Sequence, residues 1–500
     1  MAAISLLWRS QPSFDPYAWL IWARQLTSIS EVPFGVASPT GWKPLPVLLN
    51  LPLAPLGISI APVVWVWFVR TCALLCLVEA WRLGRLAAGV PAAIGAVALL
   101  VLTPQAVPLI AGGITEAVVT LLLLWGVRTH LEGRPRSAFL AGVTAALARP
   151  EMMLAAFPYG VWQAARGRLG RALVVVSPLV AALLWASGDW IGYGRPFAIA
   201  GQASTGAEPK QVQAAELPGL ELLARSGDQV QVGVALVAAL AFVAAIAWAE
   251  PVTRALGVVV VSVVVPVAIA TQFGYPAVPR YLGPLFAVVS VAAGIGAGRL
   301  ASVPGGRGAR VAAGAACGAA MLVLAVPAAV DSDRADWRWY AARSSEDATL
   351  GEAIASAGGR QAVVDCGPAL AWPADHHTAV AFNLDVRMAM EGDWSVPGVW
   401  RWVSTRTARM PNPSVVFVNS PQLERVDLAG DPSNREGLRT LAPAVVAVAG
   451  RDVVVDPIGR AGGWTIIQMR KSGTAPCAAV VRWREGADGR VSSPGSRSPA

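Results

Sequence analysis

The chain has 500 residues, of which 55% are hydrophobic and 14% are charged, and its mean hydropathy is +0.53. This balance excludes an ordinary soluble protein and indicates one that crosses a membrane several times. The net charge of +9 is carried mostly by arginine. Because short cytoplasmic loops of membrane proteins collect Lys and Arg, this charge indicates which loops are cytoplasmic and does not indicate nucleic acid as a partner.

The chain begins with an apolar stretch, "MAAISLLW", which is too short to span a membrane and lacks the basic start of a signal peptide. We interpret it as the outer end of a first helix that the sequence does not contain. The next stretch, "SFDPYAWLIWARQL" at residues 13–26, predicts a helix with Pro16 in its first turn. Asp15 stands at its start, where a carboxylate can act as a general base, bind a metal or cap the helix.

The remainder of a first outer loop, residues 9–58, contains "PTGWKPLPVLLNLPLAPLG". Its prolines favour an extended chain, and Trp42 fits the aromatic belt at a membrane surface. Lys43 could neutralise the phosphate of a substrate. The alternative is a lysine whose ammonium group reaches lipid headgroups.

Apolar runs near the ~20 residues that cross a bilayer follow. They cover residues 60–81, 90–110, 112–127, 171–187, 230–249, 255–273, 281–299 and 310–330. The loops between them alternate between arginine-rich and nearly uncharged, so the arginine-rich loops are assigned to the cytoplasmic side. These arginines are Arg82, Arg85, Arg128, Arg134, Arg136, Arg166, Arg168, Arg171, Arg254, Arg299, Arg307 and Arg310.

The segment from residue 137 to 163 has the length of one crossing, yet arginines on both sides place its two ends on the same side. We therefore expect Pro150 to break it into two short helices, about 137–147 and 152–164, that enter the membrane and return. With this re-entrant pair the chain would have about 10–11 membrane helices. The fold class is thus an α-helical polytopic membrane bundle.

Ionisable residues at membrane depth are candidates for function because burying them is costly. Glu116 in "AGGITEAVV" lies just inside an apolar helix, and Arg149 and Glu151 flank the expected break. Arg149 and Glu151 could bind substrate, or they could satisfy each other and the broken helix. Arg70 lies in the middle of an apolar run and is expected to face the bundle interior.

A late helix opens with "GYPAVPRYLGPLF", which places Arg280 and Tyr281 at its outer end. The guanidinium group of arginine matches a phosphate with two parallel hydrogen bonds and stays charged at all relevant pH values. The alternative is an anchor for lipid headgroups beside an aromatic-belt tyrosine.

After residue 330 the pattern changes to a domain at residues 331–484, expected to be α/β or α+β, followed by a disordered tail at 485–500. "RQAVVDCG" and "PSVVFVNS" are strand-like. Cys366 and Cys477 could form a disulfide if this domain is exported, whereas Cys72, Cys76 and Cys317 lie in apolar runs and are expected to pack. His376 and His377 lack a third ligand, which favours surface or packing roles over a metal site.

The order of these features resembles the GT-C superfamily of integral-membrane glycosyltransferases, which use polyprenyl-phosphate sugars. It is most similar to the bacterial protein mannosyltransferases and aminoarabinose transferases. The resemblance covers about residues 13–330 and is carried by the order of an acid in the first outer loop, "WKPLP", "GGITE", "ARPE" and "VPRYLGP".

The resemblance implies that Asp15 is the catalytic base or helps to hold a metal, and that Arg280 and Lys43 face the lipid-linked phosphate. Several branches have a second acid after the first, where this chain has Pro16. No cofactor is therefore certain, and a divalent metal stays open.

The resemblance further implies a polyprenyl-phosphate donor of mannose or a pentose and a cell-envelope glycan, lipid or protein as acceptor. The expected location is the bacterial plasma membrane, with the C-terminal domain extracytoplasmic and membrane lipid around the helices. Two other classes stay open, a transporter or flippase of lipid-linked sugars and a catalytically inactive scaffold. A transporter should show related halves, and the sequence contains no such repeat.

Overall fold

The computed structural model forms two compact units, each described here by itself. The first, called the bundle, comprises Met1–Pro12, Trp42–Asn50 and Val63–Ala341, and the second, called the C-terminal unit, comprises Ser13–Gly41, Leu51–Pro62 and Ala342–Ala500. The structure describes residues 11–29, 41–103, 110–194, 196, 207–230, 239, 243, 250–300, 341–372, 376–389, 398–401, 413–419 and 453–483.

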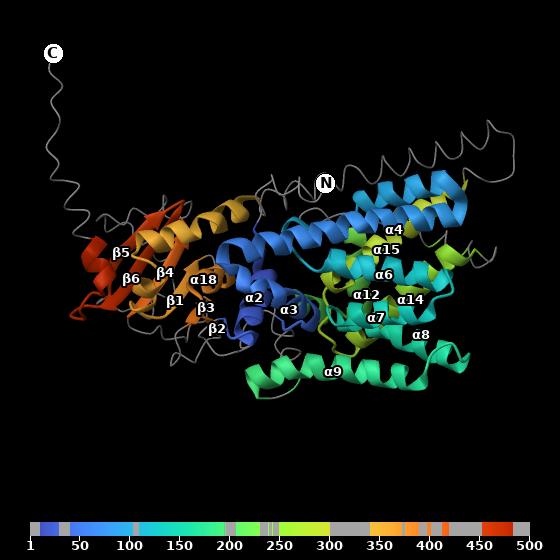
Figure 1. Cartoon of the computed structure of the whole chain (residues 1–500), viewed down its shortest axis with the longest axis horizontal. Coiled ribbons are helices and arrows are strands. Elements are labelled where there is room, and N and C mark those ends of the chain that lie inside the picture. The colour runs from blue at the N-terminus through green and yellow to red at the C-terminus, as the bar shows by residue number, and fades with distance from the viewer. Residues whose placement is uncertain are drawn as a thin grey trace, which may run out of the picture. The chain divides into compact units, whose positions relative to one another are not determined.

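Helix α4 (Gly57–Val101) contains a hairpin, because its backbone leaves the helical conformation at Ala88 and Gly89. Gly89 has φ +77°, a conformation that glycine adopts without steric cost. Figure 1 shows the second part of α4 returning beside the first. The two apolar runs predicted at 60–81 and 90–110 are thus confirmed as two helices, although the second ends earlier.

The break predicted at Pro150 is also confirmed. Helix α7 (Pro135–Ala146) ends before it, the short 3-10 helix η2 (Pro150–Met152) contains it, and α8 (Met153–Ala165) follows directly. Proline has no N–H to donate and clashes with the preceding turn, so a single straight helix cannot form here. That this pair enters and leaves a membrane on the same side stays a prediction.

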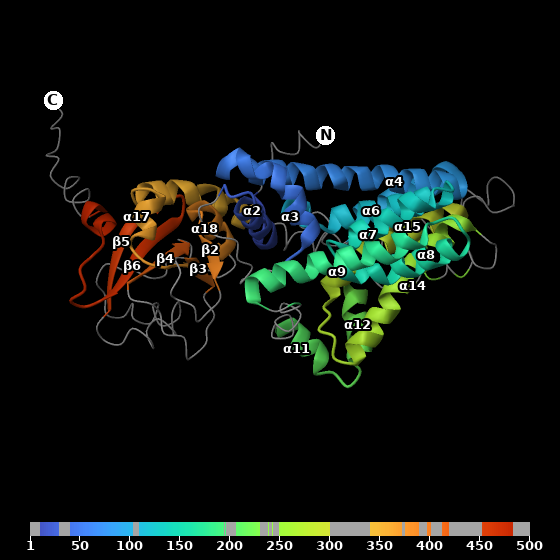
Figure 2. The same ribbon diagram turned by 60° about the horizontal axis from the view of Figure 1, so that its bottom comes forward.

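Four further bundle helices correspond to the remaining described apolar runs. They are α6 (Glu116–Leu131), α9 (Arg171–Tyr193), α14 (Pro251–Gln272) and α15 (Gly283–Leu300), with the 3-10 helix η3 (Pro279–Leu282) before α15. The extended conformation expected for the proline-rich segment after Trp42 is wrong, because α3 (Pro44–Asn50) is a helix there. The short helices α11 (Ala207–Gln213) and α12 (Pro218–Val230) lie beside one end of α14 (Figure 2). The expected helices at 230–249 and 310–330 lie outside the described residues, apart from positions 239 and 243.

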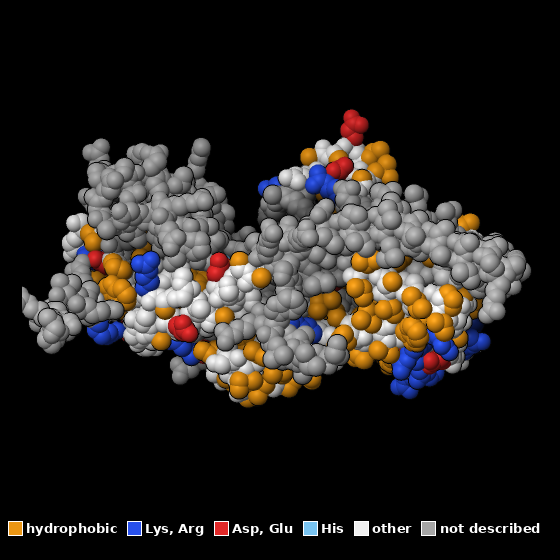
Figure 3. Space-filling view, turned by 90° about the horizontal axis from the view of Figure 1, so that it is seen from above, with side chains coloured by type: hydrophobic (Ala, Val, Ile, Leu, Met, Phe, Trp, Pro, Cys, Tyr) orange, Lys and Arg blue, Asp and Glu red, His pale blue; other side chains and the backbone are white. Residues whose placement is uncertain are grey.

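Four stretches of the described helices are long and apolar enough to cross a membrane: Pro44–Val101, which includes the hairpin, Arg171–Ile191, Pro251–Gln272 and Pro279–Arg299. Many of their large apolar side chains are exposed, such as Leu183 at 68% and Leu179 at 57% on α9. In Figure 3, apolar side chains gather on the described part of the bundle face that is in view, as lipid contact requires. The chain is a multi-pass membrane protein.

Ion pairs bring several of the arginine-rich loops together. Arg128 at the end of α6 pairs with Glu79 of α4 at 2.5 Å, and the same glutamate pairs with Arg82 at 3.0 Å. At another pair of helix ends, Arg299 of α15 lies 3.7 Å from Glu250, whose carboxylate caps the N-terminus of α14. Arginines expected on one side of the membrane are therefore neighbours in space. Figure 3 shows Lys and Arg side chains gathered at one end of the apolar surface.

The C-terminal unit contains a mixed sheet in the order β2-β3-β1-β4-β6-β5 among the described residues. Strands β2 (Arg387–Ala389), β3 (Gly398–Arg401), β1 (Ala369–Trp372) and β4 (Ser414–Asn419) are parallel, and β6 (Trp464–Lys471) is antiparallel to both β4 and β5 (Val453–Ala461). The predicted strand in "PSVVFVNS" is confirmed as β4. The domain boundary at residue 330 stays a prediction, and the tail at 485–500 lies outside the described residues.

The strand predicted in "RQAVVDCG" is wrong, because Arg360–Val364 forms the short helix α17. Gly359, at φ +91°, precedes it, and within α17 only Val363 is buried, so there is no alternating apolar face for a sheet. Cys366, two residues after α17, forms a disulfide with Cys477. Cys72 and Cys76 are free and buried in α4 as expected, and Cys317 lies outside the described residues.

This unit also contains a helix over residues 341–356 and the two helices α18 (His377–Leu384) and α2 (Phe14–Leu26). Helix α18 packs on β1, β2 and β3, and α2 packs on α18. The 3-10 helix η1 (Leu51–Leu56) also contacts α2. A segment from the start of the chain is thus built into the C-terminal unit.

Candidate functional site

A buried polar cluster lies in the bundle where α6, η2 and η3 meet. Glu116 occupies the first turn of α6, where the partial positive charge of the helix N-terminus favours a carboxylate. Arg149, in an extended conformation before η2, donates a hydrogen bond to Glu116 Oε1. Both side chains are largely buried, at 6% and 12% exposure, so this pair is shielded from solvent.

The second carboxylate of the cluster is Glu151. It accepts a hydrogen bond of 3.0 Å from the hydroxyl of Tyr275, which lies between α14 and η3. The ring of Tyr281 in η3 lies 5.6 Å from the guanidinium carbon of Arg149, a cation–π contact. Four of the residues predicted to bind substrate, Glu116, Arg149, Glu151 and Tyr281, therefore meet in one place.

Several polar atoms of this cluster are buried without a hydrogen bond to any described residue. They are Glu116 Oε2, Glu151 Oε2, Arg149 Nε and Thr115 Oγ1. A buried polar atom without a partner costs about 1–3 kcal/mol, and more if it is charged. The cluster also holds two carboxyl groups against one guanidinium group. These atoms therefore have hydrogen-bonding capacity that the described residues do not use.

Tyr275 was missed by sequence reasoning, although it lies in the same "GYPAVPRY" stretch as Tyr281. Its backbone is held by the side-chain amide of Gln213 in α11, which donates to the carbonyl oxygens of Thr271 and Tyr275 at 3.2 and 2.8 Å. The sequence does not predict this contact, because the contact depends on which helices pack against the loop that carries Tyr275.

Arg280 does not join the cluster. Its side chain is exposed and makes no ion pair or hydrogen bond with the part of the chain that the structure describes. The 3-10 turn of η3 directs the adjacent Tyr281 inward and Arg280 outward. The guanidinium group of Arg280 is therefore accessible to a ligand.

Trp42 and Lys43 precede α3. The Trp42 indole N–H donates to the carbonyl oxygen of Leu184 in α9 at 2.9 Å, and the ring lies flat on Gly188, where an added Cβ would come within 2.3 Å of it. Trp42 is 6% exposed. These contacts favour a packing role for Trp42, whereas Lys43 is half-buried.

Asp15 lies in the first turn of α2 and is half-buried. The alternative in which Asp15 caps this helix is wrong, because the helix begins at Phe14 and Ser13 is the N-cap residue. Pro16 is the third helical residue, a position that still needs no intrahelical N–H bond. Asp15 thus retains the favourable interaction of an acid with a helix N-terminus without serving as the cap.

The two neighbouring histidines are buried packing residues and not surface ones. His376 lies between Glu346 and Asp347, and the ring of His377 contacts that of Phe14 at a centroid distance of 4.4 Å. Among the described residues, no group of three His, Cys, Asp or Glu side chains could hold a metal ion.

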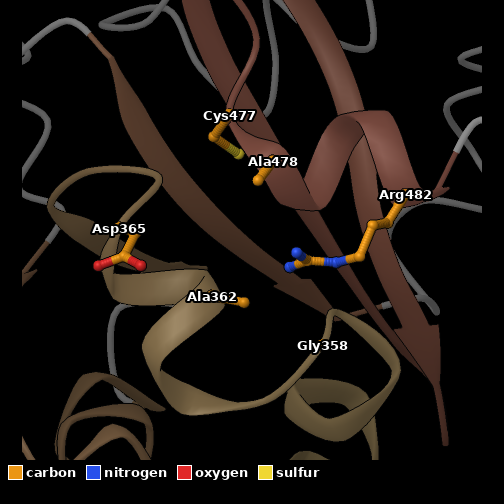
Figure 4. A pocket seen from close by; sticks show the side chains of 6 residues that line it. All are labelled: Gly358, Ala362, Asp365, Cys477, Ala478 and Arg482. Carbon is orange, nitrogen blue, oxygen red and sulfur yellow. The ribbon is translucent and has the colours of Figure 1, made fainter.

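A small open pocket of about 390 Å³ lies beside the disulfide of the C-terminal unit. In Figure 4 the guanidinium group of Arg482 points across it towards the carboxylate of Asp365. Cys477 of the disulfide lines it, whereas none of the residues predicted to bind substrate does. It is therefore separate from the polar cluster of the bundle.

No family model matches the sequence, and no curated protein matches it. Among solved structures, the fold is similar to the ArnT protein of Cupriavidus metallidurans bound to undecaprenyl phosphate, with 14% identity and a TM-score of 0.47 over 93% of this chain and 96% of that one. It is also similar to the apo oligosaccharyltransferase of Archaeoglobus fulgidus, with 12% identity and a TM-score of 0.46 over 91% of this chain and 68% of that one.

Both proteins are GT-C superfamily members, the group that the sequence resembles.

Proposed function

We propose that the protein transfers a sugar from a polyprenyl-phosphate carrier to an acceptor of the cell envelope at the outer face of the membrane. Mannose or a pentose is the proposed sugar, and Asp15 is the proposed base. The acceptor is a glycan, a lipid or a protein. The C-terminal unit is proposed to lie outside the cytoplasm of a bacterial cell.

One observation carries this proposal: Glu116, Arg149, Glu151 and Tyr281, spread over more than half of the bundle sequence, converge in one buried cluster. Burying these ionisable side chains in a lipid environment costs free energy, which indicates that they have a structural or chemical role. The unpartnered Nε of Arg149 and the carboxylate oxygens can bind the phosphate and hydroxyl groups of a sugar phosphate.

The chemistry requires one base and one cationic group. The acceptor hydroxyl attacks the anomeric carbon, the bond from that carbon to the phosphate oxygen breaks, and polyprenyl phosphate leaves. The proton of the acceptor goes to the carboxylate of Asp15. Arg280, Lys43 and Arg149 are proposed to stabilise the charge that grows on the leaving phosphate.

A transporter or flippase of lipid-linked sugars is the second candidate, because it would also need arginines for phosphate. A transporter needs no general base, so the effect of substituting Asp15 distinguishes the two functions. An inactive scaffold would need neither Asp15 nor a lipid-linked donor.

The test uses purified protein, radiolabelled polyprenyl-phosphate mannose or pentose, and membrane acceptors. We expect Asp15→Asn to lower kcat by about 10²-fold or more, the usual contribution of a general base. Arg280→Ala and Arg149→Lys should raise KM for the donor or lower kcat. Thermal denaturation of each variant separates loss of transfer from loss of folding.

Asp365→Asn is the matched control, because it removes a carboxylate of the C-terminal unit that accepts a hydrogen bond from Gln361, one helical turn earlier. It should leave transfer unchanged. Undiminished transfer by Asp15→Asn would exclude Asp15 as the base. Movement of the lipid-linked sugar across vesicles without any transfer would favour the flippase.

A further inference from the structure

Helix α2, which carries Asp15, belongs to the C-terminal unit and is buried over most of its length. Every residue from Pro16 to Gln25 is buried, and the rings of Trp19 and Trp22 are fully enclosed. A helix that lay on a membrane surface would keep one face in contact with lipid or water. The position of α2 is therefore set by packing against protein.

Helix α18 supplies a continuous set of contacts along α2. Near the N-terminus of α2, Phe14 contacts His377 at 4.4 Å between ring centroids, and one turn later Tyr17 contacts Phe382 at 5.4 Å. Aromatic pairs at these distances stabilise by about 0.5–1.5 kcal/mol beyond the area they bury. They align α2 along α18 on both sides of Asp15.

An ion pair holds the other end of α2. Arg24, which is 7% exposed, lies 3.2 Å from Asp385, and its guanidinium carbon lies 5.6 Å from the centre of the Phe382 ring. Asp385 ends α18 in the left-handed conformation, at φ +52°. It also pairs with Arg360 at 3.0 Å, so one carboxylate serves two guanidinium groups.

We propose that the C-terminal unit positions the base of the reaction through this contact, with Arg24 and Asp385 as positioning residues. The inference rests on the proposed function. Neither side chain is proposed to touch the substrate. Arg24 lies nine residues after Asp15 in the same helix, so a fixed Arg24 limits the rotation and tilt of the carboxylate at the other end.

The size of the effect follows from the burial of Arg24. A buried guanidinium group that loses its carboxylate must move towards water, and α2 would have to move with it. A displacement of about 1 Å at a reacting group can lower a rate by up to about 10²-fold. A change at the Arg24 end of the helix should therefore reduce kcat without removing any group that binds substrate.

The first experiment measures anchoring without any activity, by amide hydrogen exchange of the full chain in nanodiscs. Asp385→Asn and Arg24→Gln should each raise the exchange rate of residues 14–26 by about tenfold, because opening of α2 from the unit becomes easier. Asparagine tolerates the left-handed conformation at position 385, so the backbone of α18 is preserved. Exchange in α6 should stay unchanged.

Arg360→Gln is the matched control. Arg360 is the other partner of Asp385, is 43% exposed and forms no hydrogen bond or ion pair with the described residues of α2, so exchange in residues 14–26 should change less than twofold. Unchanged exchange in both Asp385→Asn and Arg24→Gln would overturn the anchoring. An equal increase in Arg360→Gln would overturn it as well, because the effect would then be a general loosening of α18.

The second experiment measures transfer by the same variants. Arg24→Gln and Asp385→Asn should lower kcat about tenfold or more, with the donor KM unchanged, and Arg24→Lys should restore part of the loss because it keeps the positive charge. Unchanged kcat in variants whose α2 exchanges faster would overturn the positioning role.

The two experiments also separate this inference from the proposed function. If the wild-type chain transfers no sugar, the proposed function fails and with it the role of Arg24 and Asp385 in catalysis. The exchange rates would still decide whether the C-terminal unit holds α2.

Discussion

At the scale of single residues, some buried charges in the described part of the chain form groups of more than two. His376 is 3% exposed and lies 2.8 Å from Asp347 and 3.2 Å from Glu346, and the ring of Trp464 lies 5.1 Å from its ring. Arg343 lies 3.6 Å from Asp347. Burial lowers the pKa of His376, but the hydrogen bonds to Asp347 and Glu346 raise it by more, so that the pKa is about 9. His376 is therefore protonated at neutral pH.

This pKa predicts that the C-terminal unit is less stable in alkali. Because the pKa is raised above the ordinary value of 6.5, the stabilisation is complete below pH 6.5 and is lost as pH rises to about 9. At about 1.4 kcal/mol per pKa unit, the difference corresponds to roughly 3 kcal/mol at most. Thermal denaturation between pH 6 and 9.5 measures it.

His376→Gln is the comparison chain, because it keeps a polar side chain but cannot titrate. Its thermal midpoint should be lower at pH 6 and should depend less on pH. An equal fall with pH in both chains would contradict the assignment to His376.

At the scale of the elements, close packing of small residues brings helices of the bundle together. Gly95 in the second part of α4 faces Gly294 of α15, and an added Cβ at either position would lie 2.2–2.3 Å from the backbone of the other. Gly298 meets Ala92 equally closely one turn away. Small residues permit such approach between membrane helices, where packing replaces the hydrophobic effect as the driving force.

Gly95→Ala is therefore expected to destabilise the bundle by about 1–3 kcal/mol, because the backbone of α15 must move away. The measurement is the thermal midpoint of the purified chain in detergent. Gly126→Ala is the same substitution inside α6, where the nearest atom would lie at an ordinary 3.5 Å, and it should be neutral or slightly stabilising. Equal midpoints for the two variants would contradict the close approach.

At the scale of the whole molecule, each of the two units is stabilised by different interactions. The bundle depends on apolar helices and the C-terminal unit on a mixed sheet with a disulfide between Cys366 and Cys477, which are 111 residues apart. A disulfide stabilises mainly by restricting the unfolded chain, and more so when it closes a long loop. Such bonds persist in oxidising compartments, which supports the proposed extracytoplasmic location.

The double variant Cys366→Ser/Cys477→Ser should lose about 4 kcal/mol of stability in the C-terminal unit, while the bundle should unfold as before. Thermal denaturation with and without a reducing agent measures both transitions. The double variant should not respond to the reducing agent. Thiol trapping in growing cells should find the wild-type bond oxidised, and a reduced pair would contradict the proposed location.

The sequence alone determined the membrane class, the two helices of α4, the break at Pro150 and the polar positions at Glu116, Arg149 and Glu151. These follow from local causes, namely apolar length, the missing N–H of proline and the cost of charge in lipid. The helix at "RQAVV" was misjudged because short apolar runs form either helix or strand, and the tertiary context decides.

Only the tertiary structure decided which polar residues meet. Arg149 contacts Glu116 and Tyr281, whereas the adjacent Glu151 contacts Tyr275, and Arg280 stays exposed beside them. It also placed α2 with the C-terminal domain, more than 300 residues later in the chain. Such pairings depend on the packing of distant elements, and no periodicity or spacing within a single segment encodes them.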